Sequence, residues 1–245
     1  WAIIILSFGI ALRFFPVMIL PFMIFYLSRK KKDYVILFSI GIAGLIAVEV
    51  FSYVYFGRSV IFSLLNAQHF DYILSAKIDL IIHDRIYLFV VAYFLLFFAW
   101  LHQKQKNFMV FLNYCGMVYL LYVSISYFHP QYLLWSVPFL VFLFVRRESL
   151  YYYHWAQMAF LMVILIYWGD LVTKFLIAPI DIRTAMYGTG LIPLIGRLYE
   201  PAKFVNIFRS VFTAISIWMI YLIYRDNKAI SIQENKTGTD SSIKT

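Results

Sequence analysis

The sequence has few charged residues and a single cysteine. Of its 245 residues, 13% are charged and 63% are hydrophobic. A soluble domain carries about a quarter charged residues and about half or fewer apolar ones, so a water-soluble fold is excluded. Cys115 lies in an apolar run without a second cysteine, which excludes a disulfide within the chain and argues against a metal–thiolate site. The sequence contains no P-loop, dinucleotide-binding glycine motif, HExxH or nucleophile elbow, so nothing indicates a soluble nucleotide substrate.

What the sequence does have is a series of long apolar blocks. Lipid offers no hydrogen bonds, so membrane-crossing segments are helices or closed barrels, and barrel strands alternate apolar and polar residues over about ten positions. These blocks run for about 17 to 25 residues, the length that a helix needs to cross. We therefore predict an all-α, polytopic transmembrane bundle of about seven spans. The predicted spans are 1–28, 34–56, 85–101, 108–127, 131–145, 150–169 and 204–224.

Two regions fall outside these spans. Segment 57–84 mixes apolar and charged residues with a periodicity that predicts amphipathic or re-entrant helices at the membrane surface. The tail, 225–245, is rich in Ser, Thr, Lys and Asn and is predicted to be disordered. Residues 1–224 then form one transmembrane helical domain. Because the sequence begins inside an apolar block, we expect this domain to be the C-terminal part of a larger module.

The net charge of +9 is concentrated at one set of span ends. Basic clusters flanking spans mark the cytoplasmic side, which also argues against a nucleic-acid partner. The tail is then cytoplasmic, the long connections face outward, and the protein is integral to the cell membrane, or to the endoplasmic reticulum in a eukaryote. The basic residues on the predicted cytoplasmic side are Arg29, Lys30, Lys31, Lys32, Lys104, Lys106, Arg146, Arg147, Arg225 and Lys228.

Arg13 is the one cation predicted to lie deep within a span. An unpaired cation at that depth costs at least about 2.5–3.5 kcal/mol, so Arg13 should face the bundle interior or a polar cavity. It either contacts an anionic lipid phosphate or forms an internal ion pair, for which Glu49 on the next helix is the obvious partner.

His129-Pro130-Gln131-Tyr132 marks a very short outward connection. Pro130 suits the first turn of a helix, which places His129 and Gln131 beside free N–H groups that favour an anion. The structural alternative is an interfacial turn in which Tyr132 and Trp135 contribute to an aromatic belt.

The outward connections hold further polar candidates. Arg183, Arg197 and Lys203 could cover a phosphate-bearing substrate, or belong to a connector held by pairs such as Arg197 with Glu200. In segment 57–84 the acid–base candidates are Asp71 and His69, with Asp79, Asp84 and His83. Their spacing matches no metal signature, so no metal site is assigned.

Two stretches resemble polytopic GT-C glycosyltransferases that use polyprenyl- or dolichyl-phosphate sugars. The first is Pro130-Gln-Tyr-Leu-Leu-Trp135 followed by Pro138, which is similar to a "PQYLLW…P" stretch at an outward turn of these enzymes. The second is Ala11, Arg13, Pro16, Leu20 and Pro21 before the basic cluster, although family members often have Lys at the position of Arg13. The likeness is greatest to bacterial polyprenyl-phosphate-mannose-dependent mannosyltransferases and to the first mannosyltransferase of glycosylphosphatidylinositol assembly.

The resemblance implies an inverting transfer of a sugar, with mannose expected, from a polyprenyl-phosphate donor on the non-cytoplasmic face. It assigns the donor lipid phosphate to Arg13, His129, Gln131 and Tyr132, with Arg183, Arg197, Lys203, Asp71 and His69 as weaker candidates. The family's catalytic carboxylate, which acts as the general base, is expected upstream of Trp1, so no catalytic residue is assigned. The implied partners are membrane lipid and the lipid-linked donor; no cofactor is expected, and a divalent metal is compatible with the chemistry.

Two other classes of protein fit the composition. A secondary transporter or flippase-like protein would have a polar pathway through the membrane and internal repeats, whereas only Arg13, Glu49 and Asn113 are expected at depth. A noncatalytic membrane assembly subunit would need none of the site residues.

Overall fold

The computed structural model describes residues 1–12, 15–65, 68–81, 84–126, 130–166, 182–183, 196 and 199–241, in places as backbone alone. They belong to two compact units, unit 1 (Trp1–Phe128 and Leu222–Thr245) and unit 2 (His129–Tyr221). Each unit is described by itself.

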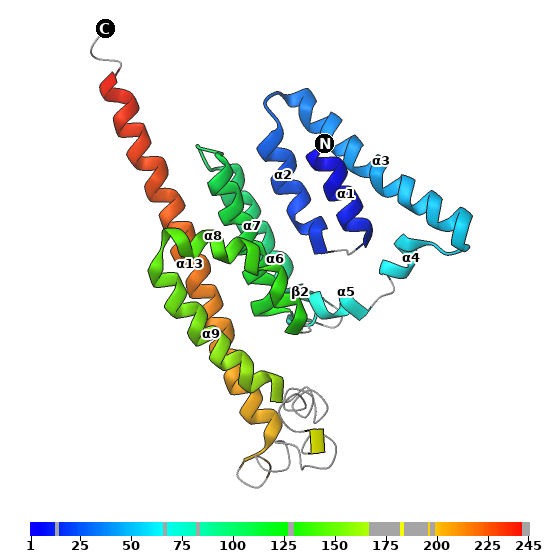
Figure 1. Ribbon diagram of the computed structural model, residues 1–245, viewed down its shortest axis with the longest axis vertical. Coiled ribbons are helices and arrows are strands. Elements are labelled where there is room, and N and C mark those ends of the chain that lie inside the picture. Colours follow the sequence, from blue (N-terminus) through cyan, green and yellow to red (C-terminus); the bar gives the residue numbers. More distant parts are fainter. Residues whose placement is uncertain are drawn as a thin grey trace. The chain divides into compact units, whose positions relative to one another are not determined.

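The described chain is mostly helical, as predicted (Figure 1). The elements of unit 1 are α1 (Ala2–Leu12), the 3-10 helix η1 (Phe15–Ile19), α2 (Leu20–Leu27), α3 (Lys31–Phe56), α4 (Val60–Leu65), α5 (Gln68–Ile73), β1 (Lys77–Asp79), β2 (Arg85–Tyr87), α6 (Leu88–Leu101) and α7 (Phe108–Ile125). Those of unit 2 are the 3-10 helix η2 (Pro130–Trp135), α8 (Val137–Arg146), α9 (Glu148–Ile166) and the first part of α13 (Pro201–Ser241), which continues into unit 1.

Three helices of the described residues are long and apolar enough to cross a membrane. They are Lys31–Phe56, Phe108–Ile125 and Pro201–Lys228. Shorter apolar helices are Pro16–Leu27, Leu88–Leu101 and Val137–Arg146. Membrane-spanning character is therefore supported, whereas the predicted number of about seven spans is not reached among these residues.

The first predicted span is not one helix. Ile3 and Leu20 would lie about 25 Å apart on a continuous helix, yet a Cβ on Gly41 of α3 would lie 3.7 Å from Ile3 Cγ2 and 3.6 Å from Leu20 Cδ1. The chain thus reverses between Leu12 and Phe15, and α1 and α2 lie side by side along α3 (Figure 1). The prediction of a single span over 1–28 is wrong, because hydropathy records apolar length and does not detect a reversal.

α3 is defined by strong signals at both ends. Asp33 Oδ2 accepts hydrogen bonds from the backbone N–H groups of Arg29 (3.0 Å) and Lys30 (2.8 Å), which suits a carboxylate in the first turn. At the other end Gly57 adopts φ 64°, a left-handed conformation that glycine tolerates, and its N–H donates to Tyr53 O at 3.0 Å. These signals confirm the predicted span 34–56 as a helix.

α1 and α3 approach closely through small residues. Ser7 Oγ donates to Ile3 O (2.8 Å) and lies 3.3 Å from Gly41 O on α3. A Cβ on Gly44 would lie 2.6 Å from Ser7 Cβ, so only glycine fits at that position. Small residues that bring helix backbones together are the usual basis of helix association in lipid.

α2 buries two opposite faces. Leu20 and Ile24, one turn apart, form a cluster with Ile3 and Ile10 of α1. On the other face Phe22 is fully buried, with its ring centroid 5.8 Å from that of Tyr93 and 5.4 Å from that of Phe97 in edge-to-face geometry. Such aromatic pairs add to the stabilisation that comes from burial alone.

Segment 57–84 is partly as predicted, and its hairpin extends to Tyr87. It contains the short helices α4 and α5, but it also contains an antiparallel β1–β2 hairpin in which Asp79 lies opposite Arg85. Residues 85–87, predicted to start the third span, are β2, which leaves α6 with 14 residues. That length is about 21 Å, less than the roughly 30 Å hydrocarbon core.

The later predicted spans also change. In place of one helix over 131–145 there are η2 and the 10-residue α8. α9 confirms a helix over the described part of 150–169. α13 covers 204–224 but does not stop at Tyr224, and Asn227 is fully buried within unit 1. The prediction of disorder from Arg225 onward therefore missed the packed residues that follow the span.

We predict that Gly44→Ala destabilises the protein whereas Gly41→Ala does not. Each substitution gains about 1 kcal/mol of helix propensity. At Gly44 the added Cβ meets Ser7 at 2.6 Å, while at Gly41 its contacts are an ordinary 3.6–3.7 Å. Forced separation of α1 and α3 should cost about 1–3 kcal/mol, measured by thermal unfolding in detergent. Ser7→Gly should rescue Gly44→Ala, and failure of this rescue would contradict the proposed contact.

Candidate functional site

In unit 1 three basic regions lie at one end of the helices. Lys106 Nζ lies 5.9 Å from the ring centroid of Phe25, just before the cluster Arg29–Lys32, and 5.5 Å from the ring centroid of Trp100. Gln103 Nε2 donates to Asn227 O at 3.4 Å. One end of unit 1 thus holds three basic regions, namely connection 102–107, the α2–α3 turn and residues 225–228. The prediction that basic regions lie on one side of the membrane requires this arrangement. Partial burial lowers the pKa of Lys106.

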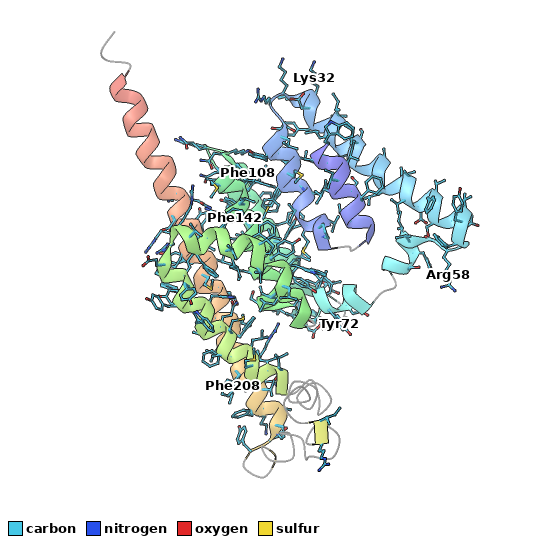
Figure 2. The ribbon with its side chains drawn as sticks, in the orientation of Figure 1. Lys32, Arg58, Tyr72, Phe108, Phe142 and Phe208 are labelled. Atoms are coloured by element: carbon cyan, nitrogen blue, oxygen red, sulfur yellow. The ribbon has the colours of Figure 1, made fainter. Side chains whose placement is uncertain are left out.

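The polar segment 57–87 belongs to the other end of α3. Figure 2 shows Lys32 at one end of α3 and Arg58 at the other, with Tyr72 also away from Lys32. Ser52 Oγ donates to Arg58 O at 2.8 Å, and Ile61 N–H donates to Glu49 Oε2 at 2.9 Å. Glu49, the predicted partner of Arg13, therefore caps α4.

The residues predicted to hold a lipid phosphate are described only in part. Arg13 and His129 lie outside the described residues. Gln131 and Tyr132 belong to η2, where the backbone alone is described. Arg13 falls in unit 1 and the other three residues fall in unit 2.

The stretch around Pro130 forms a distinct element. Pro130 begins η2, not an α-helix, and α8 starts only at Val137. Ser136 N–H and Oγ both donate to Leu133 O, at 3.0 and 2.6 Å. Leu133 and Ser136 are buried whereas Leu134 is exposed. The predicted fifth span therefore begins with a 3-10 helix and not with the expected α-helical turn. The position of His129 and Gln131 beside its first N–H groups stays a prediction, because these side chains lie outside the described set.

The weaker candidates for phosphate binding lie in different structural environments. Lys203 Nζ pairs with Glu200 Oε2 at 2.7 Å, with both side chains exposed, which supports the connector interpretation for this cation. The partner expected for Glu200, Arg197, lies outside the described residues. Arg183 is exposed, and Asp71 is exposed on α5. His69 is also on α5, with its side chain outside the described set.

Asp79 and Asp84 belong to the hairpin. Asp79 Oδ1 pairs with Arg85 Nε at 3.0 Å across the two strands, and the backbone of Asp84 closes the turn through Leu80 and Ile81. Exposed ion pairs stabilise by about 0–1 kcal/mol, so this one mainly fixes the strand register. His83 lies outside the described residues. In the part of the chain that the structure describes, no three His, Cys, Asp or Glu side chains are grouped to hold a metal ion.

Buried polar side chains form a pair in unit 1 that the sequence analysis did not identify. Asn113 Nδ2 of α7 donates to Asn227 Oδ1 of α13 at 2.6 Å, and both residues are buried. The sequence signal was a polar residue in each of two otherwise apolar helices, but nothing in the sequence says which of them meet.

Unit 2 contains a second buried polar group. Gln157 Nε2 of α9 donates to Ser216 Oγ of α13 at 2.6 Å, and Gln157 Oε1 lies 3.0 Å from His154 Nδ1. Ser216 Oγ donates to Phe212 O at 2.8 Å. Side-chain hydrogen bonds between helices contribute about 0.6–2 kcal/mol in membranes. His154 therefore belongs to the polar contacts within this unit.

Comparisons of the chain with protein-family models, with curated proteins and with solved structures find no match. The fold and the described residues define a mostly helical chain whose helices are suited to a membrane.

We predict that Lys77→Cys and Lys104→Cys label from opposite sides of the membrane. Both residues are exposed, and the buried native thiol would be removed by Cys115→Ala. An impermeant maleimide should modify Lys77→Cys in intact cells, and Lys104→Cys only after permeabilisation, because basic ends face the cytoplasm. Labelling of Lys104→Cys in intact cells would invert the topology.

We predict that Asn227→Leu weakens the attachment of α13 to α7. The change leaves the Asn113 amide buried without its acceptor, at a cost of about 1–3 kcal/mol. Hydrogen exchange of residues 222–228 should accelerate accordingly. The double change Asn113→Leu/Asn227→Leu removes both partners and should recover part of the loss; if it proves additive, the hydrogen bond has no coupling energy.

Proposed function

We propose that this chain is an integral membrane glycosyltransferase that takes a sugar, with mannose expected, from a polyprenyl-phosphate donor on the non-cytoplasmic face. The observation that carries the proposal is the stretch Pro130-Gln-Tyr-Leu-Leu-Trp135 with Pro138, the sharpest resemblance to GT-C enzymes. The finer topology of about seven spans with a cytoplasmic C-terminus belongs to the same proposal.

The form of that stretch supports a specific role. It folds as a single 3-10 helix, and the side chains of Leu133 and Ser136 are buried beside the exposed Leu134. Short 3-10 segments are frequent at the ends of α-helices and as connectors, and η2 ends just before α8 begins. A connector that is held in place by the burial of Leu133 and Ser136 is compatible with a binding loop.

The arrangement of unit 1 gives independent support. Its basic regions lie together at one end, and segment 57–87, with Asp71 and the Asp79–Arg85 pair, lies toward the other. Under the positive-inside rule the second end faces outward, where lipid-linked sugars are consumed by enzymes of this type.

In the proposed reaction a carboxylate takes the proton of an acceptor hydroxyl while that oxygen attacks the anomeric carbon. The bond from this carbon to the lipid phosphate breaks, so the configuration inverts. Arg13, His129, Gln131 and Tyr132 would hold the departing phosphate, where cationic and N–H donors stabilise the developing charge.

The test supplies radiolabelled polyprenyl-phosphate mannose to membranes that contain the full-length protein. Arg13→Ala and His129→Ala should each lower transfer by about 10- to 100-fold, because a hydrogen bond to a charged group contributes about 1.5–3 kcal/mol. Lys104→Ala removes an exposed charge from the predicted cytoplasmic side and should leave transfer unchanged.

Protein level in the membrane must be equal for all variants. Normal transfer by both Arg13→Ala and His129→Ala would remove these residues from the donor site. Absence of transfer by the unaltered protein would instead favour a transporter or a noncatalytic assembly subunit.

A further inference from the structure

We propose that the groove between α2 and α3 binds an acyl chain of an anionic phospholipid on the cytoplasmic side, with its phosphate held by the basic cluster Arg29–Lys32. This site is distinct from the proposed donor site and does not depend on a transferase activity.

The groove is open and almost entirely apolar. Its volume is about 390 Å³. Leu20 and Ile24 are its buried residues, and the rings of Phe25 and Tyr34 approach to 4.7 Å between centroids. The lining residues are Leu20, Pro21, Ile24, Phe25, Tyr34, Val35 and Phe38.

Helical spacing places a cation on the same face as this lining. Lys31 is the first residue of α3, and Tyr34, Val35 and Phe38 follow at i+3, i+4 and i+7. Residues at these intervals share one face of an α-helix. The groove therefore starts about one helical turn from a lysine. A phospholipid has the same sequence of groups, a phosphate followed by an acyl chain.

The cluster is available to an anion. Arg29, Lys30, Lys31 and Lys32 are exposed, and no carboxylate of the described residues pairs with their side chains. The nearest acid, Asp33, accepts the backbone N–H groups of Arg29 and Lys30. Clustered lysines and arginines at the cytoplasmic end of a membrane helix attract anionic lipid.

The exposed surface around the groove identifies the occupant as lipid. α3 is long and apolar enough to cross a membrane and is mostly exposed, with Val35, Ile36 and Phe38 each more than half exposed. An acidic peptide or a nucleic acid would match the cations but not the apolar wall that continues from them. A phospholipid satisfies both at once.

The experiment reconstitutes the whole protein in nanodiscs that contain equal amounts of phosphatidylglycerol and phosphatidylcholine with identical acyl chains. Native mass spectrometry then counts the lipids that the protein retains. We expect phosphatidylglycerol to be retained over phosphatidylcholine by about 25-fold or more, because the cluster holds more than two cations. Lys31→Gln/Lys32→Gln should lower its affinity about 25-fold, since each lysine near the surface contributes about fivefold.

The matched control is Lys104→Gln/Arg225→Gln, which removes two exposed cations from the same end of unit 1. It should change retention by less than about twofold. Val35→Trp places a large side chain on the exposed rim of the groove and should lower retention of phosphatidylglycerol without loss of thermal stability.

Three outcomes would overturn the proposal. Equal loss in the control and cluster variants would show a general effect of surface charge. Unchanged retention by Val35→Trp would exclude the groove. Full competition by inorganic phosphate would indicate a site for free phosphate, with no acyl chain involved.

Discussion

The burial of α2 on two opposite faces is the constraint on which the rest of unit 1 depends. Leu20 and Ile24 pack with α1 and α3, while Phe22 packs among the aromatic rings of α6 and α7. Because the chain reverses before α2 and turns again after it, this short helix fixes where α3 begins. The place of the basic cluster, and of the groove beside it, follows from that packing.

α7 is the helix against which the other side of unit 1 is assembled. It is the most buried of the three long apolar helices, and Tyr26 of α2 stacks on Phe111 at 4.8 Å. Asn107 caps the start of this helix, with its Oδ1 accepting from Val110 N–H, and Asn113 Nδ2 donates to Asn227 Oδ1 of α13. In lipid the hydrophobic effect does not drive apolar helices together. Ring packing and hydrogen bonds such as this one therefore decide which helices associate.

The sequence predicted some parts well for local reasons. The predicted bounds 34–56 and the predicted start at 108 lie within three residues of those of α3 and α7, where Asp33, Gly57 and Asn107 are residue types that favour helix ends. Apolar length predicted helices at these positions but not the reversal after Leu12, because an antiparallel pair of short helices has the same composition as one span. The strand at 85–87 and the packed Asn227 depend on cross-strand and interhelical contacts, which a single sequence does not reveal. For the candidate site, the sequence identified the stretch from Pro130 to Trp135, but it assigned an α-helix where a 3-10 helix forms.

One lipid molecule cannot occupy both of the proposed lipid sites. α3 is 26 residues long, so Lys31 and Phe56 lie about 38 Å apart along its axis. Under the proposed topology, a donor phosphate on the outward side and a phosphate at Arg29–Lys32 would be separated by about the thickness of a bilayer.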